Sequence, residues 1–249
     1  MPDRPFPQAP VYAVPEGLRV YAIGDVHGCL RQLEAMHKAI AADLQENPPE
    51  AAHIIYLGDY VDRGPDSRGV LDFLIAQRDR QDGIARTFIL GNHEQGLFEF
   101  LERPAHEIWT EWGGLQTLES YGLAPPPILL PAVKAELSRA FAACLPSTHL
   151  EFLQSLQTHI VIGDYIFAHA GIDPRKTLDE QKVSDFTFIR VPFLDWPDPL
   201  PLKVVHGHTI CPEPENLPHR ICVDTGAYKG GPLSCVVLED TAVRFLQVK

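Results

Sequence analysis

The chain has 249 residues, of which 45% are hydrophobic, so it can bury the core of one large α/β domain. Its formal net charge of -12 argues against non-specific binding to nucleic acids, because polyanions would be repelled. The five cysteines include no Cys-x-x-Cys pair and are odd in number. This pattern argues against a zinc knuckle or a disulfide framework and fits a reducing compartment.

The first segment, residues 1–17, is rich in proline, which prevents a regular helix. We expect an extended N-terminal arm here, followed by one domain over 18–249. The N-terminus lacks the basic and apolar stretches of a signal peptide, and no later run reaches the roughly 18 apolar residues of a membrane span. The sequence therefore predicts a cytoplasmic protein with no membrane partner.

Short apolar runs alternate with helical patterns in the first part of the chain. Each run ends in Gly-Asp or Gly-Asn, as expected for buried strands that lead into turns. Alternating strands and helices predict βαβ units with parallel pairing. The predicted strands are 18–23, 54–57 and 87–90, and the predicted helices are 30–44, which ends before Pro48, and 67–77.

From about 97 to 156 the pattern becomes helical, with breaks at proline and glycine clusters, which predicts a helical insertion or lid. Closely spaced strands then follow, which suggests antiparallel pairing toward the C-terminus. We expect mixed sheets covered by helices. The later predicted strands are 159–162, 165–168, 203–206, 220–224, 233–238 and 242–247.

Polar side chains gather directly after the predicted strands. Loops at the carboxyl ends of strands are where α/β proteins assemble their sites. Aspartate, histidine and asparagine offer the oxygen and nitrogen ligands that suit Mn, Fe or Zn. The six clusters are Asp25-Val-His27, Asp59 with Asp62-Arg63, Asn92-His93-Glu94, His169, His206-Gly-His208, and Asp224.

Two neighbouring ions need one ligand that touches both, and a carboxylate can do this where an imidazole cannot. Asp59 is the best candidate for this bridge. Asp25 and His27 alternate along one loop and could face a first ion. The second ion could be held by Asn92, His169 and His208.

Each of these residues also has an ordinary interpretation. Asp25 could belong to a simple turn, His169 could be a packed imidazole, and Asp62-Arg63 could be a surface ion pair. The recurrence of such clusters at successive strand ends favours the metal site. Packed imidazoles are expected at His53, His106, His149 and His159.

Five ordered motifs resemble those of the phosphoprotein phosphatase branch of the calcineurin-like metallophosphoesterases. They read GDVHG, GDYVDRG, GNHE, HAG and GHT, at residues 24–28, 58–64, 91–94, 169–171 and 207–209. The resemblance implies a four-layer α/β sandwich, in which two mixed β-sheets are flanked by helices, here with the helical insertion. It also implies two divalent metal ions, with Mn preferred and Fe, Zn, Ni or Co as alternatives.

The resemblance assigns the metal ligands as above and adds further roles. It places the catalytic pair on His93 and Asp62. Arg63 would grip the phosphate together with a second arginine, for which Arg190 is the nearest match and Arg175 is an alternative. The expected reaction is attack on phosphorus by a metal-bridging hydroxide, with His93 as the general acid.

Two features concern the substrate. Residues 109–122 are similar to a segment of prokaryotic members, which implies a bacterial protein. The whole motif set implies a serine/threonine protein phosphatase acting on a phosphoprotein or a phosphorylated small molecule. Ala170 after His169 is shared with symmetrical diadenosine tetraphosphatases, so a dinucleotide hydrolase stays as the alternative. Trp109, Trp112 and Tyr121 could stack on adenine or could belong to the core.

Two smaller alternatives complete the expectations. A non-catalytic metal-binding scaffold is disfavoured, because such a protein need not retain His93, Asp62 and Arg63. Cys29 follows the first metal loop, where its oxidation could disturb Asp25 and His27, although a small buried thiol is the simpler interpretation.

Overall fold

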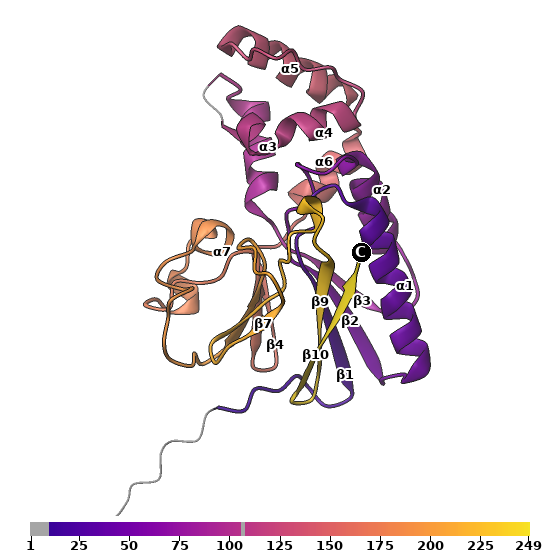
Figure 1. Ribbon diagram of the computed structural model, residues 1–249, viewed down its shortest axis with the longest axis vertical. Coiled ribbons are helices and arrows are strands. Elements are labelled where there is room, and N and C mark those ends of the chain that lie inside the picture. Colours follow the sequence, from indigo (N-terminus) through magenta and orange to yellow (C-terminus); the bar gives the residue numbers. More distant parts are fainter. Residues whose placement is uncertain (1–9, 106–107) are drawn as a thin grey trace, which may run out of the picture.

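The computed structural model describes residues 10–105 and 108–249. Two five-stranded sheets pack face to face beneath a helical lobe (Figure 1). The first sheet has the order β10-β9-β1-β2-β3, with β1 parallel to β2 and β2 parallel to β3. Its strands are β1 (Leu18–Ile23), β2 (Ala51–Tyr56), β3 (Ala85–Phe88), β9 (Leu233–Glu239) and β10 (Ala242–Val248).

The second sheet has the order β4-β5-β6-β8-β7. Antiparallel pairing was expected here, and that expectation was wrong for β5, β6 and β8, which are parallel to one another. More than thirty residues separate β5 from β6, which leaves room for the crossover that a parallel pair requires. The strands are β4 (His159–Ile162), β5 (Tyr165–Ala168), β6 (Lys203–His206), β7 (Glu215–Asn216) and β8 (Arg220–Cys222).

The layers follow from where the apolar side chains point. Val20 and Ile55 of the first sheet pack with Phe167 and Val205 of the second in a core between the sheets. The outer face of the first sheet is covered by α1 (Leu30–Glu46) and α2 (Ser67–Arg78), and Phe186 of α7 (Val183–Phe188) packs on the outer face of the second. The predicted four-layer arrangement of two mixed sheets flanked by helices is confirmed.

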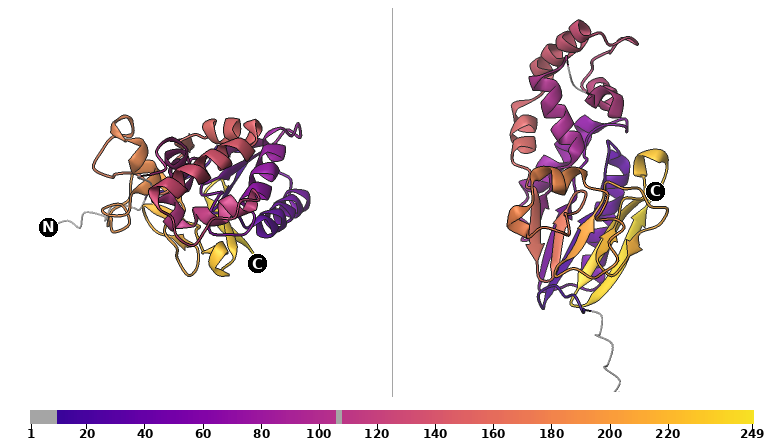
Figure 2. Two further views of the ribbon diagram at one scale, coloured as in Figure 1. Left: turned by 90° about the horizontal axis from the view of Figure 1, so that it is seen from above. Right: turned by 90° about the vertical axis from the view of Figure 1, so that its left-hand side faces the viewer.

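The predicted helical stretch contains α3 (Asn92–Glu102), a 3₁₀ turn η1 (Trp109–Trp112), α4 (Gly114–Ser120), α5 (Pro131–Cys144) and α6 (Ser147–Gln154). It forms the lobe above the sheets, and Figure 2 shows it from two further sides. The α3 helix begins at Asn92, five residues before the expected start. The Glu94 side chain accepts a hydrogen bond from the N–H of the N-cap Gly91, which stabilises this earlier start.

Several smaller expectations concern single residues. His53, His149 and His159 make hydrogen bonds or ring stacks inside the fold, as expected; His106, like residues 1–9 of the arm, lies outside the described residues. The rest of the arm packs on the domain: Tyr12 and Val14 are buried. None of the described helices is both long and apolar enough to cross a membrane. Two further 3₁₀ turns are η2 (Leu178–Glu180) and η3 (Ala227–Lys229).

Candidate active site

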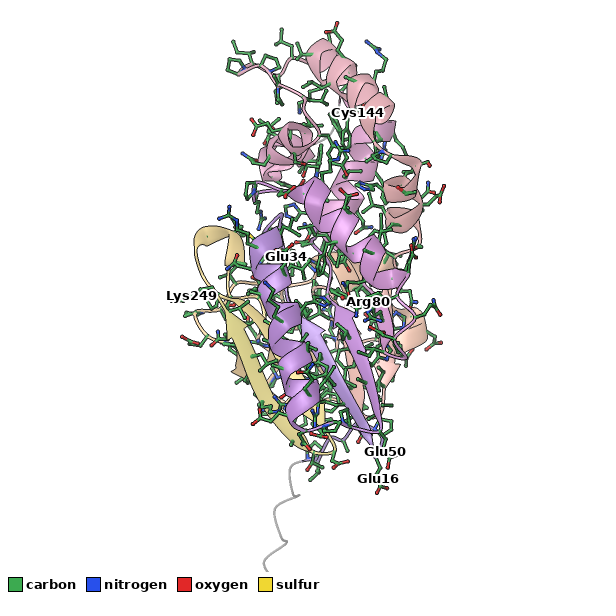
Figure 3. The ribbon with its side chains drawn as sticks, turned by 90° about the vertical axis from the view of Figure 1, so that its right-hand side faces the viewer. Glu16, Glu34, Glu50, Arg80, Cys144 and Lys249 are labelled. Atoms are coloured by element: carbon green, nitrogen blue, oxygen red, sulfur yellow. The ribbon has the colours of Figure 1, made fainter. Side chains whose placement is uncertain are left out.

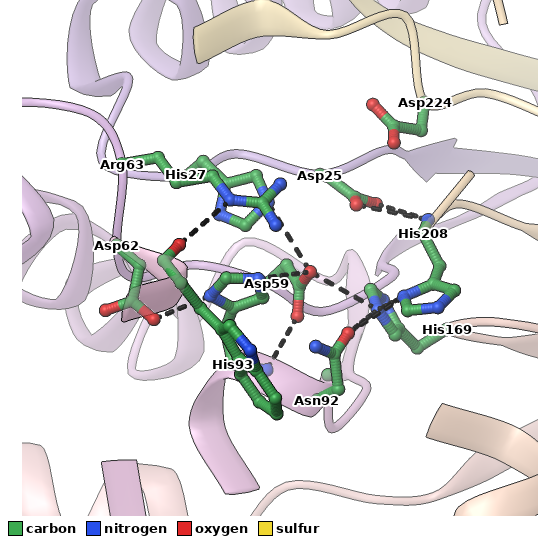
Figure 4. A network of polar contacts seen from close by, with 12 residues as sticks. Asp25, His27, Asp59, Asp62, Arg63, Asn92, His93, His169, His208 and Asp224 are labelled. Carbon is green, nitrogen blue, oxygen red and sulfur yellow. Dashed lines mark hydrogen bonds and ion pairs between the residues drawn. The ribbon is translucent and has the colours of Figure 1, made fainter. Parts of the chain in front are cut away.

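The polar clusters predicted from the sequence converge at one end of the two sheets. The loops after β1 and β2 and the start of α3 come from the first sheet, and the loops after β5 and β6 come from the second. Figure 4 shows the side chains gathered around Asp59, with Asp25 directed toward His208 and Asp62 toward His93. The carboxyl ends of parallel strands meet at this edge, which brings distant segments together.

Asp59 lies at the centre of a group of imidazoles. Its Oδ2 is 3.4 Å from His27 Nε2, 3.3 Å from His169 Nε2 and 3.8 Å from His93 Nε2. All four side chains are at most 2% exposed. His27, Asp59 and His93 could hold one cation, and Asp59, His169 and His208 could hold another. A carboxylate common to both groups is the arrangement that a bridging ligand requires.

Asn92 joins the group that contains His169 and His208. Its Oδ1 lies 2.9 Å from His169 Nε2 and 2.8 Å from His208 Nδ1, and the two imidazole nitrogens are 3.1 Å apart. Three ligand atoms therefore converge within hydrogen-bonding distance of one another. The oxygen of an amide and two imidazole nitrogens suit a divalent ion of intermediate hardness.

The Asp25 carboxylate lies on the other side of His208. Its oxygens accept the His208 backbone N–H at 3.1 and 3.2 Å. Burial and the nearby charge of Asp224 raise the pKa of Asp25 well above its usual value. Asp25 is not part of either tight group around Asp59, although it is buried in the same site.

The charge balance of this site favours a bound cation. Burial lowers the pKa of His27 to about 3 and that of His208 to about 2, so both imidazoles are neutral and can act as ligands. Burial also acts to lower the pKa of His169, but the charges of Asp59, Asp25 and Glu94 outweigh it and raise this pKa to about 10. Several carboxylates are buried here together, and divalent ions would neutralise them.

The backbone of the site adopts an uncommon conformation. Five site residues other than glycine have positive φ, between 44° and 75°. Each such residue costs about 1–3 kcal/mol, which the surroundings must offset. The five are His27, Asp59, Asp62, Arg63 and His208.

Glu94 stabilises this strained loop. Its buried carboxylate accepts the backbone N–H groups of Asp59 at 2.9 Å, Tyr60 at 2.7 Å and Val61 at 3.3 Å, besides that of Gly91. Glu94 belongs to the Asn-His-Glu cluster, but no role of its own was predicted for it from the sequence. The spacing of a buried acid three residues after Gly91 could have suggested a cap, but not its contacts with residues 59–61.

His93 and Asp62 form a buried pair. His93 Nδ1 lies 2.6 Å from Asp62 Oδ2, and the other carboxylate oxygen accepts a hydrogen bond from the Thr117 hydroxyl of α4. Burial acts to lower the pKa of His93, but the Asp59 charge and the bond to Asp62 outweigh it, so the pKa is raised. Asp62 is fully buried, which excludes the surface ion pair with Arg63.

Arg190 and Arg175, the two candidates for the second phosphate-binding arginine, differ in position. Arg63 and Arg190 both line a cavity of about 240 Å³ at this site. Arg190 is exposed and donates to the Thr209 hydroxyl at 3.0 Å. Arg175 instead forms a two-pronged ion pair with Asp173, at 2.8 and 2.7 Å, and does not line the cavity.

Aromatic side chains form the rim of this cavity. Trp112 and Phe188 line it, with ring centroids 6.2 Å apart, and Phe188 is 40% exposed. The Arg63 guanidinium lies over the ring of Tyr228 in η3, with its Cζ 4.7 Å from the centre of the ring. Phe188 and Tyr228 were not predicted from the sequence, since no motif includes them. The full lining is Asp59, Arg63, Asn92, His93, Trp112, Phe188, Arg190 and His208.

Trp109, Tyr121 and Cys29 do not reach the substrate side of the site. Trp109 is 1% exposed and Tyr121 6% exposed in the lobe core, so neither is available to stack on adenine. The Cys29 thiol points to the His27 carbonyl at 3.5 Å, and burial raises its pKa to about 11, so its reactivity is low.

A family model for the calcineurin-like phosphoesterases matches residues 18–232. The chain belongs to this family. It is therefore a hydrolase of the metallophosphoesterase class, and dinuclear metal sites are typical of the family. The predicted membership is confirmed, and the non-catalytic scaffold is set aside.

Similar proteins are named either as nucleosyl-tetraphosphatases or as protein phosphatases. An asymmetrical bis(5'-nucleosyl)-tetraphosphatase of Bacillus velezensis is 28% identical over 85% of this chain and 86% of its own. Shewanella-like protein phosphatase 2 of Arabidopsis thaliana is 30% identical over 62% of this chain and 46% of its own. A solved structure of a protein assigned as a diadenosine tetraphosphatase has a TM-score of 0.62 at 22% identity, covering 96% of this chain and 99% of that one.

Proposed function

We propose that this phosphoesterase hydrolyses dinucleoside polyphosphates and cleaves them asymmetrically. The observation that carries this proposal is the cavity, in which two arginines and the Trp112–Phe188 rim surround the candidate metal ligands. Relatives of matching length named asymmetrical bis(5'-nucleosyl)-tetraphosphatases support it. A polyphosphate chain needs several positive partners, and a nucleobase can stack on an aromatic rim.

The residues that would hold the ions are the convergent groups around Asp59 together with Asp25, which is buried in the same site. Asp59 would bridge, His27 with Asp25 would hold one ion, and Asn92, His169 and His208 would hold the other. Bound divalent ions would supply the Lewis acidity that makes water nucleophilic near neutral pH. The Asp25 carboxylate accepts the His208 backbone N–H and has further lone pairs that could face an ion.

Side chains of the site would then orient the phosphate groups and protonate the leaving oxygen. Arg63 and Arg190 would neutralise phosphate oxygens through charge-assisted hydrogen bonds. His93, whose Nδ1 is hydrogen-bonded to the Asp62 carboxylate, would donate a proton to the leaving oxygen from Nε2. The bond to Asp62 occupies Nδ1 and so leaves Nε2 free to face the substrate.

A serine/threonine protein phosphatase remains the second candidate. The likeness to the Arabidopsis protein phosphatase favours it, as does the exposure of Phe188 and Arg190 at the rim, since a phosphorylated peptide needs open access. A dinucleotide differs from a peptide in its leaving group: a phosphate leaves readily, whereas a serine alkoxide needs the general acid.

Parallel kinetics would separate the two candidates. The metal-stripped protein, reconstituted with manganese, should hydrolyse diadenosine tetraphosphate with a higher kcat/KM than a phosphothreonine peptide, and the products should be ATP and AMP. Two molecules of ADP would instead indicate symmetrical cleavage. Peptide preference would overturn the proposal in favour of the protein phosphatase.

A variant of the rim sharpens this experiment. Trp112→Ala should raise KM for the dinucleotide about 10-fold, since stacking on one base contributes about 1–3 kcal/mol. The same change should leave p-nitrophenyl phosphate hydrolysis within about 2-fold. Equal losses on both substrates would remove the stacking role.

A further inference from the structure

One short segment of the helical lobe contacts a loop of the candidate active site. Figure 3 shows the lobe above α1. Its turn η1 and helix α4 lie against the loop after β2, which carries Asp62 and Arg63. The Arg63 backbone N–H donates to the Gly113 carbonyl at 3.1 Å, and the Arg63 Nε donates to the Trp112 carbonyl at 3.2 Å. The lobe therefore supplies hydrogen-bond partners to residues that the site uses.

Thr117 of α4 makes two hydrogen bonds to Asp62. Its Oγ1 donates to Asp62 Oδ1 at 2.6 Å and accepts the Asp62 backbone N–H at 2.9 Å. Ser67, at the start of α2, accepts the same N–H at 3.0 Å, and its hydroxyl lies 3.0 Å from that of Thr117. All three residues are fully buried. A single hydroxyl group of the lobe thus holds both the backbone and the carboxylate of Asp62.

The backbone of Asp62 needs such support because its conformation is strained. Asp62 and Arg63 have φ of 75° and 68°, in the left-handed region that residues other than glycine rarely adopt. Such conformations persist only where surrounding contacts determine them. Here the contacts come from Thr117 and Gly113 of the lobe and from Ser67. Without the Thr117 hydroxyl, the Asp62 carboxylate would lose the partner that fixes its orientation.

The two oxygens of the Asp62 carboxylate have different partners. Oδ1 accepts from Thr117, and Oδ2 lies 2.6 Å from His93 Nδ1 (Figure 4). The carboxylate therefore cannot rotate about its Cβ–Cγ bond without losing one of these hydrogen bonds, and bonds to a charged group are the stronger ones. The direction in which Oδ2 meets the His93 ring depends on Thr117. So does the direction of Nε2, on the other side of that ring.

We propose that Thr117 is a positioning residue for the general acid. Its hydroxyl orients the Asp62 carboxylate, and Asp62 orients His93 so that Nε2 faces the leaving oxygen. This role rests on the proposed action of His93 as the general acid, and it gives the helical lobe a part in proton transfer. A purely structural role of Thr117 would instead lower the turnover of all substrates alike, whatever their leaving groups.

Two aryl phosphates of equal charge test this role in the manganese-loaded full-length protein. Phenol is a weaker acid than p-nitrophenol, so phenyl phosphate needs the general acid more than p-nitrophenyl phosphate does. Thr117→Val removes the hydroxyl and keeps the side-chain shape; it should lower kcat about 10-fold for phenyl phosphate and less than about 2-fold for p-nitrophenyl phosphate. Thr117→Ser retains the hydroxyl and should restore most of the lost rate. Equal losses on both substrates, or no rescue by serine, would overturn the proposal.

His93→Ala separates this role from the proposed function. It should lower the ratio of the phenyl phosphate rate to the p-nitrophenyl phosphate rate more than Thr117→Val does, and adding Thr117→Val to it should change the ratio no further. An unchanged ratio in His93→Ala would overturn the acid role itself, and the positioning role with it. A lowered ratio in His93→Ala beside an unchanged one in Thr117→Val would overturn only the positioning role. The matched control Thr87→Val removes a buried hydroxyl that bonds His53 at 2.9 Å and should not change the ratio.

Discussion

The inner part of the candidate active site and its rim are built in different ways. The inner residues, such as Asp59, His93 and His169, are at most 2% exposed and are held by buried hydrogen bonds, and Asp59 also lies on strained backbone. The rim residues Phe188 and Arg190 are exposed and belong to α7 and the segment after it. The difference indicates that the fold fixes the geometry of the inner groups more strictly than that of the rim, and we propose that the rim contributes to substrate choice.

The largest expected effect is on the general acid of the inner part. His93→Ala should lower kcat for a phosphoserine peptide by about 100- to 10,000-fold, the usual contribution of general acid catalysis. Hydrolysis of p-nitrophenyl phosphate should fall far less, because its leaving group needs no proton. Steady-state kinetics on both substrates test this, and equal losses would remove His93 from the acid role.

The strained loop should depend on Glu94. In Glu94→Gln the amide NH₂ would face backbone N–H groups that now donate to the carboxylate, which should lower the free energy of unfolding by about 3 kcal/mol. Chemical denaturation of the purified variant would measure the loss. Glu99→Gln, on the exposed face of the same helix, is the matched control and should be neutral; equal stability of both variants would contradict the capping role.

Catalytic efficiency should depend on where an arginine lies relative to the cavity, and not only on its charge. Arg190→Ala should reduce kcat/KM about 10- to 100-fold, since hydrogen bonds to charged groups contribute about 1.5–3 kcal/mol. Arg175→Ala removes the same charge outside the cavity and should have little effect. Kinetics with diadenosine tetraphosphate would compare them, and the reverse ranking would assign the second phosphate contact to Arg175.

The smallest expected effect is a shift in pH dependence. His93 must be protonated to act, and its raised pKa keeps it so as pH rises above 6.5, so activity should fall only above that raised value. Asp62→Asn removes a partner that raises this pKa, and the basic limb should move to lower pH by about one unit. A pH–rate profile on the phosphoserine peptide measures it; an unmoved limb would contradict the pairing.

The strands and the motif residues could be predicted from the sequence, whereas contacts between distant segments could not. β1 was expected over 18–23 and is observed as Leu18–Ile23, because its apolar run and the following Gly24 leave little choice. The motif residues were placed correctly at strand ends. Contacts between distant segments, such as Thr117 with Asp62 or Tyr228 under Arg63, leave no periodic signal. The parallel pairing of β5 with β6 was missed because a crossover without a long helix resembles a loop.

Metal content tests the central claim most directly, that the buried groups around Asp59 hold two ions. Manganese bound per chain should be measured after dialysis, together with hydrolysis of diadenosine tetraphosphate, for the wild type and Asp59→Asn. We predict two ions and turnover for the wild type, and at most one ion with no measurable turnover for the variant. Two bound ions and full activity in Asp59→Asn would contradict the bridging role.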